Sequence, residues 1–353
     1  MSEVDEQLVD LVAERQRIVG DISRHKLETG IATRDYQREK KVLDGARARA
    51  TSRGLNPDVA EQILKLLIES SLTSQEQARV VAEGAGSGRS ALVIGGAGQM
   101  GRWFSDYLAS QGFAVRIADP SAAGGDYPWV ADWQDDDLSE DVIVVAAPIG
   151  VTAEILSKLA DRRPGGLILD IGSLKSPLRA GLEELVRAGC QVTSIHPMFG
   201  PDTRLLSDRH VVFVDLGVPE ATRAARRLFA STMAQQIEMS LEEHDRLIAY
   251  VLGLSHALNI VFFTALSESG ELVPRLQQMS STTFDAQLRV ASLVAHDNPH
   301  LYFEIQALND FGSDALNALS DAATRIRDLV ASGDEAGFVA LMQAGRRYME
   351  SRR

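Results

Sequence analysis

The sequence has a single cysteine, Cys190, in 353 residues. One thiol excludes an intramolecular disulfide and a cysteine-rich metal site, which is typical of a reducing compartment. Positive charge is also in deficit, because 36 Lys and Arg face 49 Asp and Glu; the net charge of −13 indicates that nucleic acid is not a partner. We find no signal peptide and no apolar run of about 18 residues, so we expect a cytosolic protein with no membrane partner.

The most informative stretch is SALVIGGAGQMG, residues 90 to 101, where an apolar run breaks into glycines. The run predicts a buried strand, and Gly96, Gly98 and Gly101 have the G-x-G-x-x-G spacing of a dinucleotide-binding turn. Asp119 ends the next predicted strand, where an acid binds ribose hydroxyls and favours NAD over NADP; Arg116, inside that strand, is poorly placed to compensate a 2′-phosphate. The residues expected to contact the cofactor are Gly95, Gly96, Gly98, Gln99, Met100, Gly101, Asp119 and Pro148.

Three segments of the chain differ in their hydrophobic pattern. Residues 1–86 have the spacing of three helices, with Thr33 as a candidate cap of the second, and end in a flexible, glycine-rich linker. Residues 87–240 alternate strands and helices, which predicts a doubly wound parallel sheet of the Rossmann type. Residues 241–353 show no convincing strand, and the apolar stretch 247–266 is expected to be buried, with a subunit interface as one place for it. The expected fold class is therefore α plus α/β, with an all-helical C-terminal dimerisation domain.

Charged residues interrupt the apolar faces of the N-terminal helices. The first helix has its apolar seam at positions 8, 11, 15, 18, 22 and 26, so Arg15 and Lys26 point where leucines would be expected. Buried cations are costly unless a ligand or partner neutralises them. Between Arg24 and Arg53, nine Lys or Arg stand against four Asp or Glu, an excess that suits a small anion with more than one carboxylate. The alternative is a docking arm whose charges pair with each other or reach water.

The pieces LVAERQRIV, HK, TRDYQRE and LIESSLTSQ give this segment a resemblance to the all-helical chorismate mutase family. The resemblance implies a pericyclic rearrangement of chorismate to prephenate, in which cations stand beside the charge that develops on the ether oxygen. The pocket residues that it implies are Arg15, Lys26 and Arg38 for the carboxylates and the ether oxygen, Asp35 and Glu39 for the ring hydroxyl and its surroundings, and Ser71 and Gln75 for the remaining wall. A further arginine that the family has near the start of its first helix is absent from this sequence, so the mutase is expected to be weakened, retuned or only structural.

Two predicted strand ends in the middle segment carry polar residues that suit oxidation chemistry. HPMFGPD, residues 196–202, follows one strand, and DIGSLKS, residues 170–176, ends its neighbour. Since parallel strands present their carboxyl ends at the cofactor edge of an open sheet, we expect His196 and Ser173 near a nicotinamide. An imidazole with an ordinary pKa of about 6.5 is neutral at cellular pH and can act as a base. Lys175 is a candidate for binding a carboxylate or the cofactor, but the ordinary interpretation is an exposed loop lysine.

Together with GGAGQMG and AAPIGVT, these motifs resemble the prephenate dehydrogenase family over about residues 91 to 310. The resemblance implies an NAD-dependent oxidative decarboxylation of prephenate to 4-hydroxyphenylpyruvate, as in tyrosine biosynthesis, with His196 as the base and Ser173 orienting it or the substrate hydroxyl. It implies that Ser255 and His256, buried side by side on the long apolar helix, line the pocket of a small dicarboxylate substrate. Both resemblances imply a homodimer.

One stretch departs from that dehydrogenase family. At SSTTFDAQLRVASL, residues 280–293, the family places arginines for the carboxylates of the substrate, but Asp285 and Leu293 stand at those positions. Arg289 lies one helical turn from each and is the candidate carboxylate clamp. An acid at position 285 repels a dicarboxylate and attracts an ammonium group. This raises the alternative that the substrates are 4-amino-4-deoxychorismate and 4-amino-4-deoxyprephenate, with 4-aminophenylpyruvate as the product in secondary metabolism.

Two other classes of protein fit parts of the sequence. The 3-hydroxyacid dehydrogenases also join a Rossmann domain to helices, but they use a lysine from the helical part, and this chain has no lysine after Lys175. An NAD-binding regulator that has lost catalysis stays open, because the family's arginines are missing from the stretch 280–293.

Overall fold

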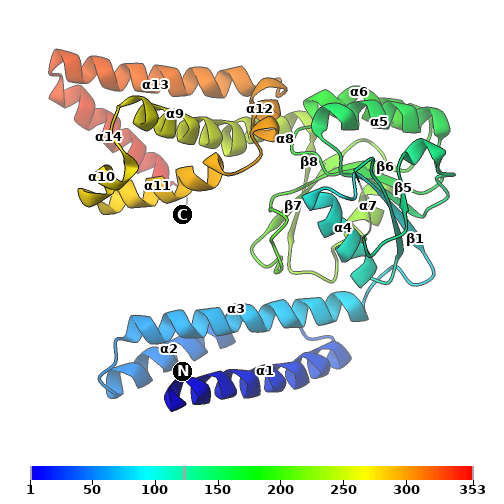
Figure 1. Ribbon diagram of the computed structural model, residues 1–353, viewed down its shortest axis with the longest axis horizontal. Coiled ribbons are helices and arrows are strands. Elements are labelled where there is room, and N and C mark those ends of the chain that lie inside the picture. Colours follow the sequence, from blue (N-terminus) through cyan, green and yellow to red (C-terminus); the bar gives the residue numbers. More distant parts are fainter. Residues whose placement is uncertain (1, 122–124, 352–353) are drawn as a thin grey trace. The chain divides into compact units, whose positions relative to one another are not determined.

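The computed structural model describes residues 2–121 and 125–351 of the chain. Its contacts divide the chain into two units, Met1–Ser173 with Leu178–Ser240 and Leu174–Pro177 with Leu241–Arg353 (Figure 1). The first unit contains the N-terminal helices and an eight-stranded sheet. The second contains helices and, among its described residues, no strand, as the sequence predicts.

The N-terminal helices are α1 (Glu3–Thr29), α2 (Tyr36–Ser52) and α3 (Pro57–Ala82). Helix α1 begins with a capping box, in which the side chains of Ser2 and Asp5 each bind the backbone N–H of the other residue. The cap of α2 is Asp35 and not Thr33, because the Asp35 carboxylate accepts a hydrogen bond from the backbone N–H of Arg38 at 2.9 Å. The prediction of Thr33 as the cap is therefore wrong by two positions.

The linker between these helices and the sheet is packed against the chain. The N–H of Gly86 donates to the carbonyl of Gln111 at 3.0 Å, and a Cβ on Gly84 would lie 2.4 Å from the same carbonyl oxygen. Glycine is needed here because two backbones approach closely, so the expectation of a flexible linker is wrong.

The strands of the sheet stand in the order β3-β2-β1-β4-β5-β6-β7-β8. They are β1 (Ser90–Ile94), β2 (Ala114–Ala118), β3 (Trp129–Val130), β4 (Val142–Val145), β5 (Leu167–Asp170), β6 (Val192–Pro197), β7 (His210–Asp215) and β8 (Gln235–Ser240). The helices of this part are α4 (Gln99–Ser110), η1 (Trp133–Asp135), α5 (Ile149–Arg162), η2 (Ser176–Leu178), α6 (Arg179–Arg187) and α7 (Pro219–Leu228). Strands β1 to β6 pair in parallel and have the Rossmann order, with the ligand-binding switch point between β1 and β4.

The prediction of a parallel sheet fails at one place, because β7 runs antiparallel to β6. The connecting segment, residues 198–209, contains no helix. A parallel neighbour needs a crossover, usually an α-helix, whereas an antiparallel one needs only a loop. The two-residue edge strand β3 is also absent from the sequence prediction.

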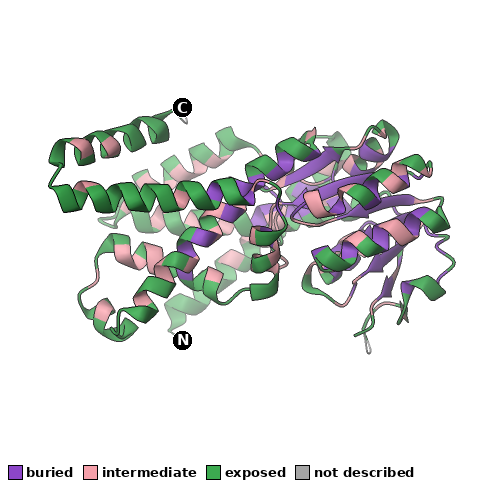
Figure 2. Ribbon diagram, turned by 90° about the horizontal axis from the view of Figure 1, so that it is seen from above, coloured by how far each residue is buried: buried purple, intermediate pink, exposed green. Residues whose placement is uncertain are grey.

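Buried residues concentrate in the strands and on the helix faces turned toward them (Figure 2). All residues of β4 and β5 are buried, which is typical of strands covered on both faces. This close-packed layer fixes the positions of the strand ends, where the predicted cofactor and substrate groups lie.

The second unit consists of α8 (Leu241–Ile248), the π-helical η3 (Ala249–Leu254), α9 (Ser255–Glu268), α10 (Val273–Gln278), α11 (Thr282–Ala295), α12 (Pro299–Ala307), α13 (Gly312–Ser332) and α14 (Glu335–Glu350). The first three continue as one helix from Leu241 to Glu268. By length and composition this helix is apolar enough to cross a membrane, so the expectation that no such run exists is wrong.

The long helix packs against α11 on one side and leaves apolar side chains exposed elsewhere. Asn259, near its middle, accepts a hydrogen bond from Gln287 of α11 at 2.8 Å. Leu258 and Val261 are 47% and 54% exposed in the single chain, which leaves an apolar surface for another protein surface to cover.

The short segment Leu174–Pro177 belongs to the helical unit through Asp245 of α8. The Asp245 carboxylate accepts hydrogen bonds from the backbone N–H of Lys175 at 3.0 Å and from the N–H and hydroxyl of Ser176. Although burial opposes ionisation, bonds from His244 and Ser176 hold the pKa of Asp245 below its usual range. The side chain of Lys175 is fully buried, so the expectation of an exposed loop lysine is wrong.

Candidate active sites

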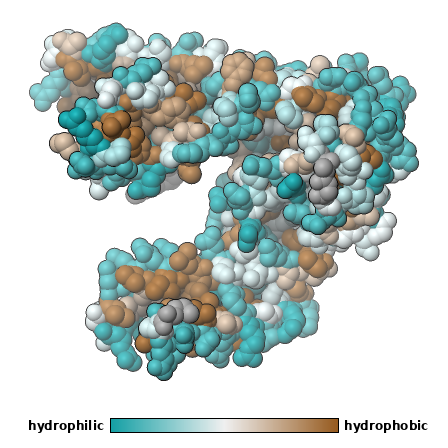
Figure 3. Space-filling view, in the orientation of Figure 1, coloured by the Kyte–Doolittle hydropathy of each residue, from teal (hydrophilic) through white to brown (hydrophobic). Residues whose placement is uncertain are grey.

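A cavity of about 440 Å³ lies among α1, α2 and α3. Its lining includes every residue of the mutase-like pocket expected from the sequence: Arg15, Lys26, Asp35, Arg38, Glu39, Ser71 and Gln75. The rest of the wall consists of Glu14, Thr33 and apolar residues such as Ile18 and Ile22. Apolar side chains also gather on the surface of these helices (Figure 3). Convergent charged groups in an apolar cavity suit a small ligand with several polar groups. The individual roles of these residues stay predictions.

The two cations of α1 point inward. Arg15 donates to the carbonyl of Leu67 at 2.9 Å and to the hydroxyl of Ser71. Lys26 Nζ donates to the carbonyl of Thr33 at 2.6 Å. Neither cation forms an ion pair with a described residue, and burial lowers the pKa of Arg15 from its usual value without neutralising a guanidinium at pH 7. Arg15 and Lys26 therefore keep their positive charges available to an anion.

Gln75 presents an unsatisfied group in the same cavity. Its Nε2 donates to the carbonyl of Ser71 at 3.3 Å, while its buried Oε1 has no hydrogen-bond partner among the residues that the structure describes. A buried acceptor without a donor is costly. A ligand group can satisfy it, directly or after the amide has turned over.

The acids in the lining of this cavity are Glu14, Asp35 and Glu39, and the last two have different surroundings. Asp35 uses one carboxylate oxygen to cap α2. Glu39 accepts two hydrogen bonds from Arg34, at 3.0 and 3.1 Å. Arg34 belongs to the TRDYQRE stretch, but the sequence did not single it out, because no local pattern marks its further partners at Ser207 and Asp208.

The predicted strand, glycine turn and helix are present between β1 and α4. Gly95 has a φ of 83°, and a Cβ on Gly101 would lie 2.1 Å from the carbonyl oxygen of Gly95, so the fold itself needs both glycines. Gly98 has an ordinary φ of −66°, and among the described residues the one atom within 4 Å of a Cβ there is the Gly95 oxygen at 3.3 Å. Gly98 caps α4 without a side-chain bond, which leaves the first-turn N–H groups open to a phosphate.

Asp119 is held at the end of β2, beside this turn. Its Oδ2 accepts a hydrogen bond from the N–H of Ala97 at 3.1 Å, and its Oδ1 from that of Ser121 at 2.8 Å. Each oxygen keeps a lone pair for a ribose hydroxyl. Arg116 instead binds Asp136 and Glu140, at 2.6 and 3.2 Å, so it does not offer its charge to a 2′-phosphate beside Asp119. These residues fit NAD.

Substitution by alanine is expected to have different effects at Gly98 and at Gly101. Gly98→Ala should raise the KM for NAD about tenfold and leave the thermal unfolding temperature almost unchanged, because the added methyl meets the pyrophosphate and little protein. Gly101→Ala should destabilise the fold by about 2 kcal/mol, because its methyl meets the Gly95 carbonyl. Steady-state kinetics and thermal unfolding of both variants test this contrast. An unchanged KM in Gly98→Ala would place the cofactor elsewhere.

His196 and Ser173 lie at the carboxyl edge of the sheet, where β1 and β4 lead into the glycine turn and Pro148. Strand β6 stands two strands from β4, about 10 Å at ordinary strand spacing. Ser194 of β6 pairs with Asp170 of β5, and His196 shares their face because strand side chains alternate. His196 is 4% exposed. The edge therefore holds a buried imidazole on the side where a dinucleotide binds.

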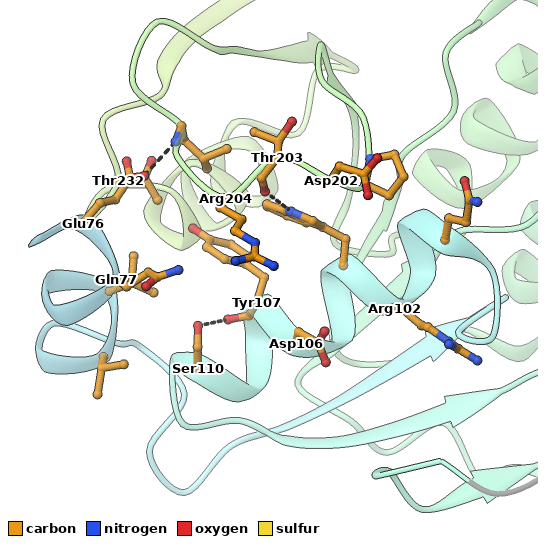
Figure 4. A pocket seen from close by; sticks show the side chains of 16 residues that line it. Glu76, Gln77, Arg102, Asp106, Tyr107, Ser110, Asp202, Thr203, Arg204 and Thr232 are labelled. Carbon is orange, nitrogen blue, oxygen red and sulfur yellow. Dashed lines mark hydrogen bonds between the residues drawn. The ribbon is translucent and has the colours of Figure 1, made fainter. Parts of the chain in front are cut away.

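A larger cavity, of about 650 Å³, lies between α3 and α4, and Figure 4 shows its lining. Of the expected site residues it contains only Gln99. Glu76 of α3 also lines this cavity, and its carboxylate accepts hydrogen bonds from the N–H of Leu206 at 2.7 Å and from that of Met233 at 2.5 Å. Arg15 and Lys26, which have no ion-pair partners in the described chain, line the smaller cavity and not this one.

In the helical unit, Ser255 and His256 lie on α9 and Asp285 and Arg289 on α11. The two helices pack together, with the rings of Phe262 and Phe284 6.1 Å apart. Ser255 is exposed and its hydroxyl donates to the carbonyl of Val251 at 2.7 Å, so the expectation that it is buried is wrong for the single chain. Its hydroxyl satisfies the backbone of its own helix.

His256 is half-buried and stacks on Tyr302, with ring centroids 4.0 Å apart. Burial lowers its pKa, so the ring is neutral at pH 7. Its Nδ1 has no hydrogen-bond partner in the described part of the chain. Asp285 is half-buried and accepts a hydrogen bond from Ser280, and Arg289 is exposed. The helical unit thus offers a neutral imidazole, a carboxylate and a guanidinium on two packed helices.

Three family models match successive parts of the chain. The model for chorismate mutase type II matches residues 1–76. The model for the nucleotide-binding domain of prephenate dehydrogenase matches residues 130–237, beyond the glycine turn, and that for its dimerization domain matches residues 240–344.

Individual relatives agree with these matches. The T-protein of Enterobacter agglomerans is 26% identical over 340 residues, which cover 96% of this chain and 88% of that protein. The 4-amino-4-deoxyprephenate dehydrogenase of Streptomyces pristinaespiralis is 33% identical over 261 residues, 71% of this chain and 88% of that protein. The crystal structure of prephenate dehydrogenase from A. aeolicus with hydroxyphenyl propionate and NAD+ has a TM-score of 0.58 and 19% identity, covering 74% of this chain and 98% of that one. At that identity the likeness concerns the fold alone.

Proposed function

Because the chain belongs to the prephenate dehydrogenase family and carries a chorismate mutase domain ahead of it, we propose that it catalyses two successive reactions. The helical cavity rearranges chorismate to prephenate. The carboxyl edge of the sheet, with NAD, converts prephenate to 4-hydroxyphenylpyruvate and CO2. The observation that carries the proposal is the convergence of Arg15, Lys26 and Arg38 in one cavity without ion-pair partners among the described residues. Residues 1–86, 87–240 and 241–353 are the proposed domains.

In the mutase reaction the protein supplies position and charge, because a pericyclic step needs no nucleophile. Lys26 and Arg38 bind carboxylates and hold the substrate in its folded conformer. Arg15 is already fixed by the Leu67 carbonyl and the Ser71 hydroxyl, so it faces the ether oxygen without having to reorganise.

In the dehydrogenase reaction NAD supplies the hydride acceptor. The N–H groups after Gly98 would hold its pyrophosphate, and Asp119 would hold its ribose. His196 takes the proton of the ring hydroxyl while hydride leaves the same carbon, with Ser173 orienting the imidazole or the hydroxyl. Loss of the ring carboxylate as CO2 then gives an aromatic phenol. Burial of His196 keeps water away from this proton transfer.

We further propose that the protein is a homodimer in the cytosol. The half-exposed apolar side chains of Leu258 and Val261 leave the long helix with a surface that a second copy can cover. The match of residues 240–344 to a dimerization domain supports the same assembly. The single cysteine, Cys190, is buried and free, which fits a reducing compartment.

A second candidate function is the same pair of reactions on the 4-amino-4-deoxy analogues. A half-buried carboxylate at Asp285 favours it, because an ammonium group on the ring gains from a nearby acid. Asp35 in the helical cavity accepts a hydrogen bond from an amino group as readily as from a hydroxyl. The relative from Streptomyces pristinaespiralis, named for the amino substrate, supports this candidate.

Steady-state assays with both substrate pairs separate the two candidates. If the ring carries an ammonium group, kcat/KM for 4-amino-4-deoxyprephenate should exceed that for prephenate at least tenfold, and Asp285→Arg should reverse the preference, because one carboxylate becomes a cation. Asp285→Asn is the control, since it removes the charge without adding one. A clear preference of the unaltered protein for prephenate would end the amino candidate. NADH formation from neither substrate would favour a regulator that has lost catalysis.

A further inference from the structure

Arg34 connects the wall of the helical cavity to the segment that follows the strand of His196. Its Nε and Nη2 donate to the two carboxylate oxygens of Glu39, at 3.0 and 3.1 Å. Its Nη1 donates to Asp208 at 2.6 Å and to the hydroxyl of Ser207. A guanidinium can donate two hydrogen bonds to one carboxylate and still donate to other groups, whereas the ammonium group of a lysine is a single point charge.

The side chains of Arg34 and Glu39 are each only 19% exposed, so this pair is held in place by its surroundings. Asp208 is 65% exposed and contributes little free energy by itself. Its role is geometric, because it and Ser207 fix the end of the guanidinium that Glu39 does not occupy. Asp208 has a φ of 61°, in the left-handed region that Asp and Asn tolerate better than most residues.

A second anchor joins the same cavity to the same segment. Glu76 follows Gln75 of the cavity wall, and it is 3% exposed. One of its carboxylate oxygens accepts from Leu206, next to Ser207, and the other from Met233. Figure 4 shows Glu76 of α3 beside this segment. The segment 198–209 is therefore fixed to α3 by Glu76 and to the connection that precedes α2 by Arg34.

We propose that Arg34 is a positioning residue of the mutase-like site, and that Ser207 and Asp208 of the sheet region complete this site by fixing Arg34. Glu39 carries negative charge into a cavity that binds a dicarboxylate. With both oxygens held by Arg34, its carboxylate keeps one orientation toward the ring substituent. Released from Arg34, it can turn toward the substrate carboxylates and repel them.

The inference rests on the proposed mutase reaction, and the test compares three variants of the full chain. Arg34→Lys keeps the charge but loses the two-oxygen geometry, and it should lower kcat/KM for chorismate about tenfold. Asp208→Asn keeps a residue type that tolerates the left-handed backbone but removes the charge. This variant should lower kcat/KM for chorismate about threefold. Arg47→Lys is the matched control, because Arg47 of α2 binds Asp58 and Glu61 and does not line the cavity. It should change kcat/KM less than twofold.

Two readouts distinguish positioning from general damage. Prephenate supplied directly should be oxidised by all three variants at the unaltered rate, since His196 and the cofactor turn are untouched. Hydrogen–deuterium exchange of residues 36–40 should rise in Arg34→Lys and Asp208→Asn but not in Arg47→Lys. Unchanged exchange in both, or an equal loss of the two activities, would overturn the inference. If the unaltered protein rearranges neither chorismate nor its 4-amino analogue, the proposed function fails, and the exchange measurement alone decides the inference.

Discussion

His196→Asn lowers the kcat for oxidation of prephenate, or of its 4-amino analogue, about a thousandfold, because the general base is removed. Asparagine keeps a polar side chain of similar reach at a site that is 4% exposed, so the strand pairing with Val212 should survive. Cofactor affinity should stay within about twofold, since the groups at Gly98 and Asp119 are untouched. The mutase rate should be unaffected. Steady-state rates of NADH formation give the kcat, and a fluorescence titration gives the Kd for NADH.

Ser173→Ala serves as the graded control for this prediction. Removing a residue that only orients the base or the hydroxyl should lower kcat less than removing the base itself. We expect a decrease of about tenfold. If His196→Asn kept more than a tenth of the rate, another group would be the base and the assignment to the sheet edge would be wrong. If it lost cofactor affinity as well, the substitution would have damaged the fold.

The elements that the sequence predicted well are those whose signal is local. The seam through Arg15 and Lys26 follows helical spacing, so the inward orientation of both cations could be predicted from periodicity, whereas their shared pocket was implied by the family resemblance. The glycine turn is contiguous, and its backbone geometry depends on adjacent residues. By contrast, β7 runs antiparallel because the segment before it lacks a helix, and a pattern of strands alone carries no direction.

What the sequence could not show are the pairings between distant residues. Arg34 meets Ser207 and Asp208 across more than 170 positions of the chain. The segment of Lys175 is fixed by Asp245, 70 positions away. Ser255 lies on an apolar helix and is nevertheless exposed in the single chain, because an apolar pattern does not specify which side of a helix its neighbours cover.

Arg15→Ala lowers kcat for the rearrangement of chorismate about a thousandfold and leaves the dehydrogenase rate on supplied prephenate unchanged. The loss is in kcat, because a cation facing the ether oxygen acts most on the charge of the transition state. The fold should tolerate the change, since the Ser71 hydroxyl keeps a hydrogen bond to the Leu67 carbonyl at 2.6 Å. Arg15→Lys should lose about tenfold, because it keeps the charge but not the guanidinium geometry.

Arg24→Ala on the same helix is the matched control for Arg15→Ala. Arg24 pairs with Asp21 on the exposed face, with 74% of its side chain accessible, so its loss should leave both rates and the unfolding temperature almost unchanged. Comparable mutase rates in the two variants would mean that the inward cation takes no part in the reaction. The three helices would then be a docking arm, while a dehydrogenase active on supplied prephenate would show that the sheet functions independently of that cavity.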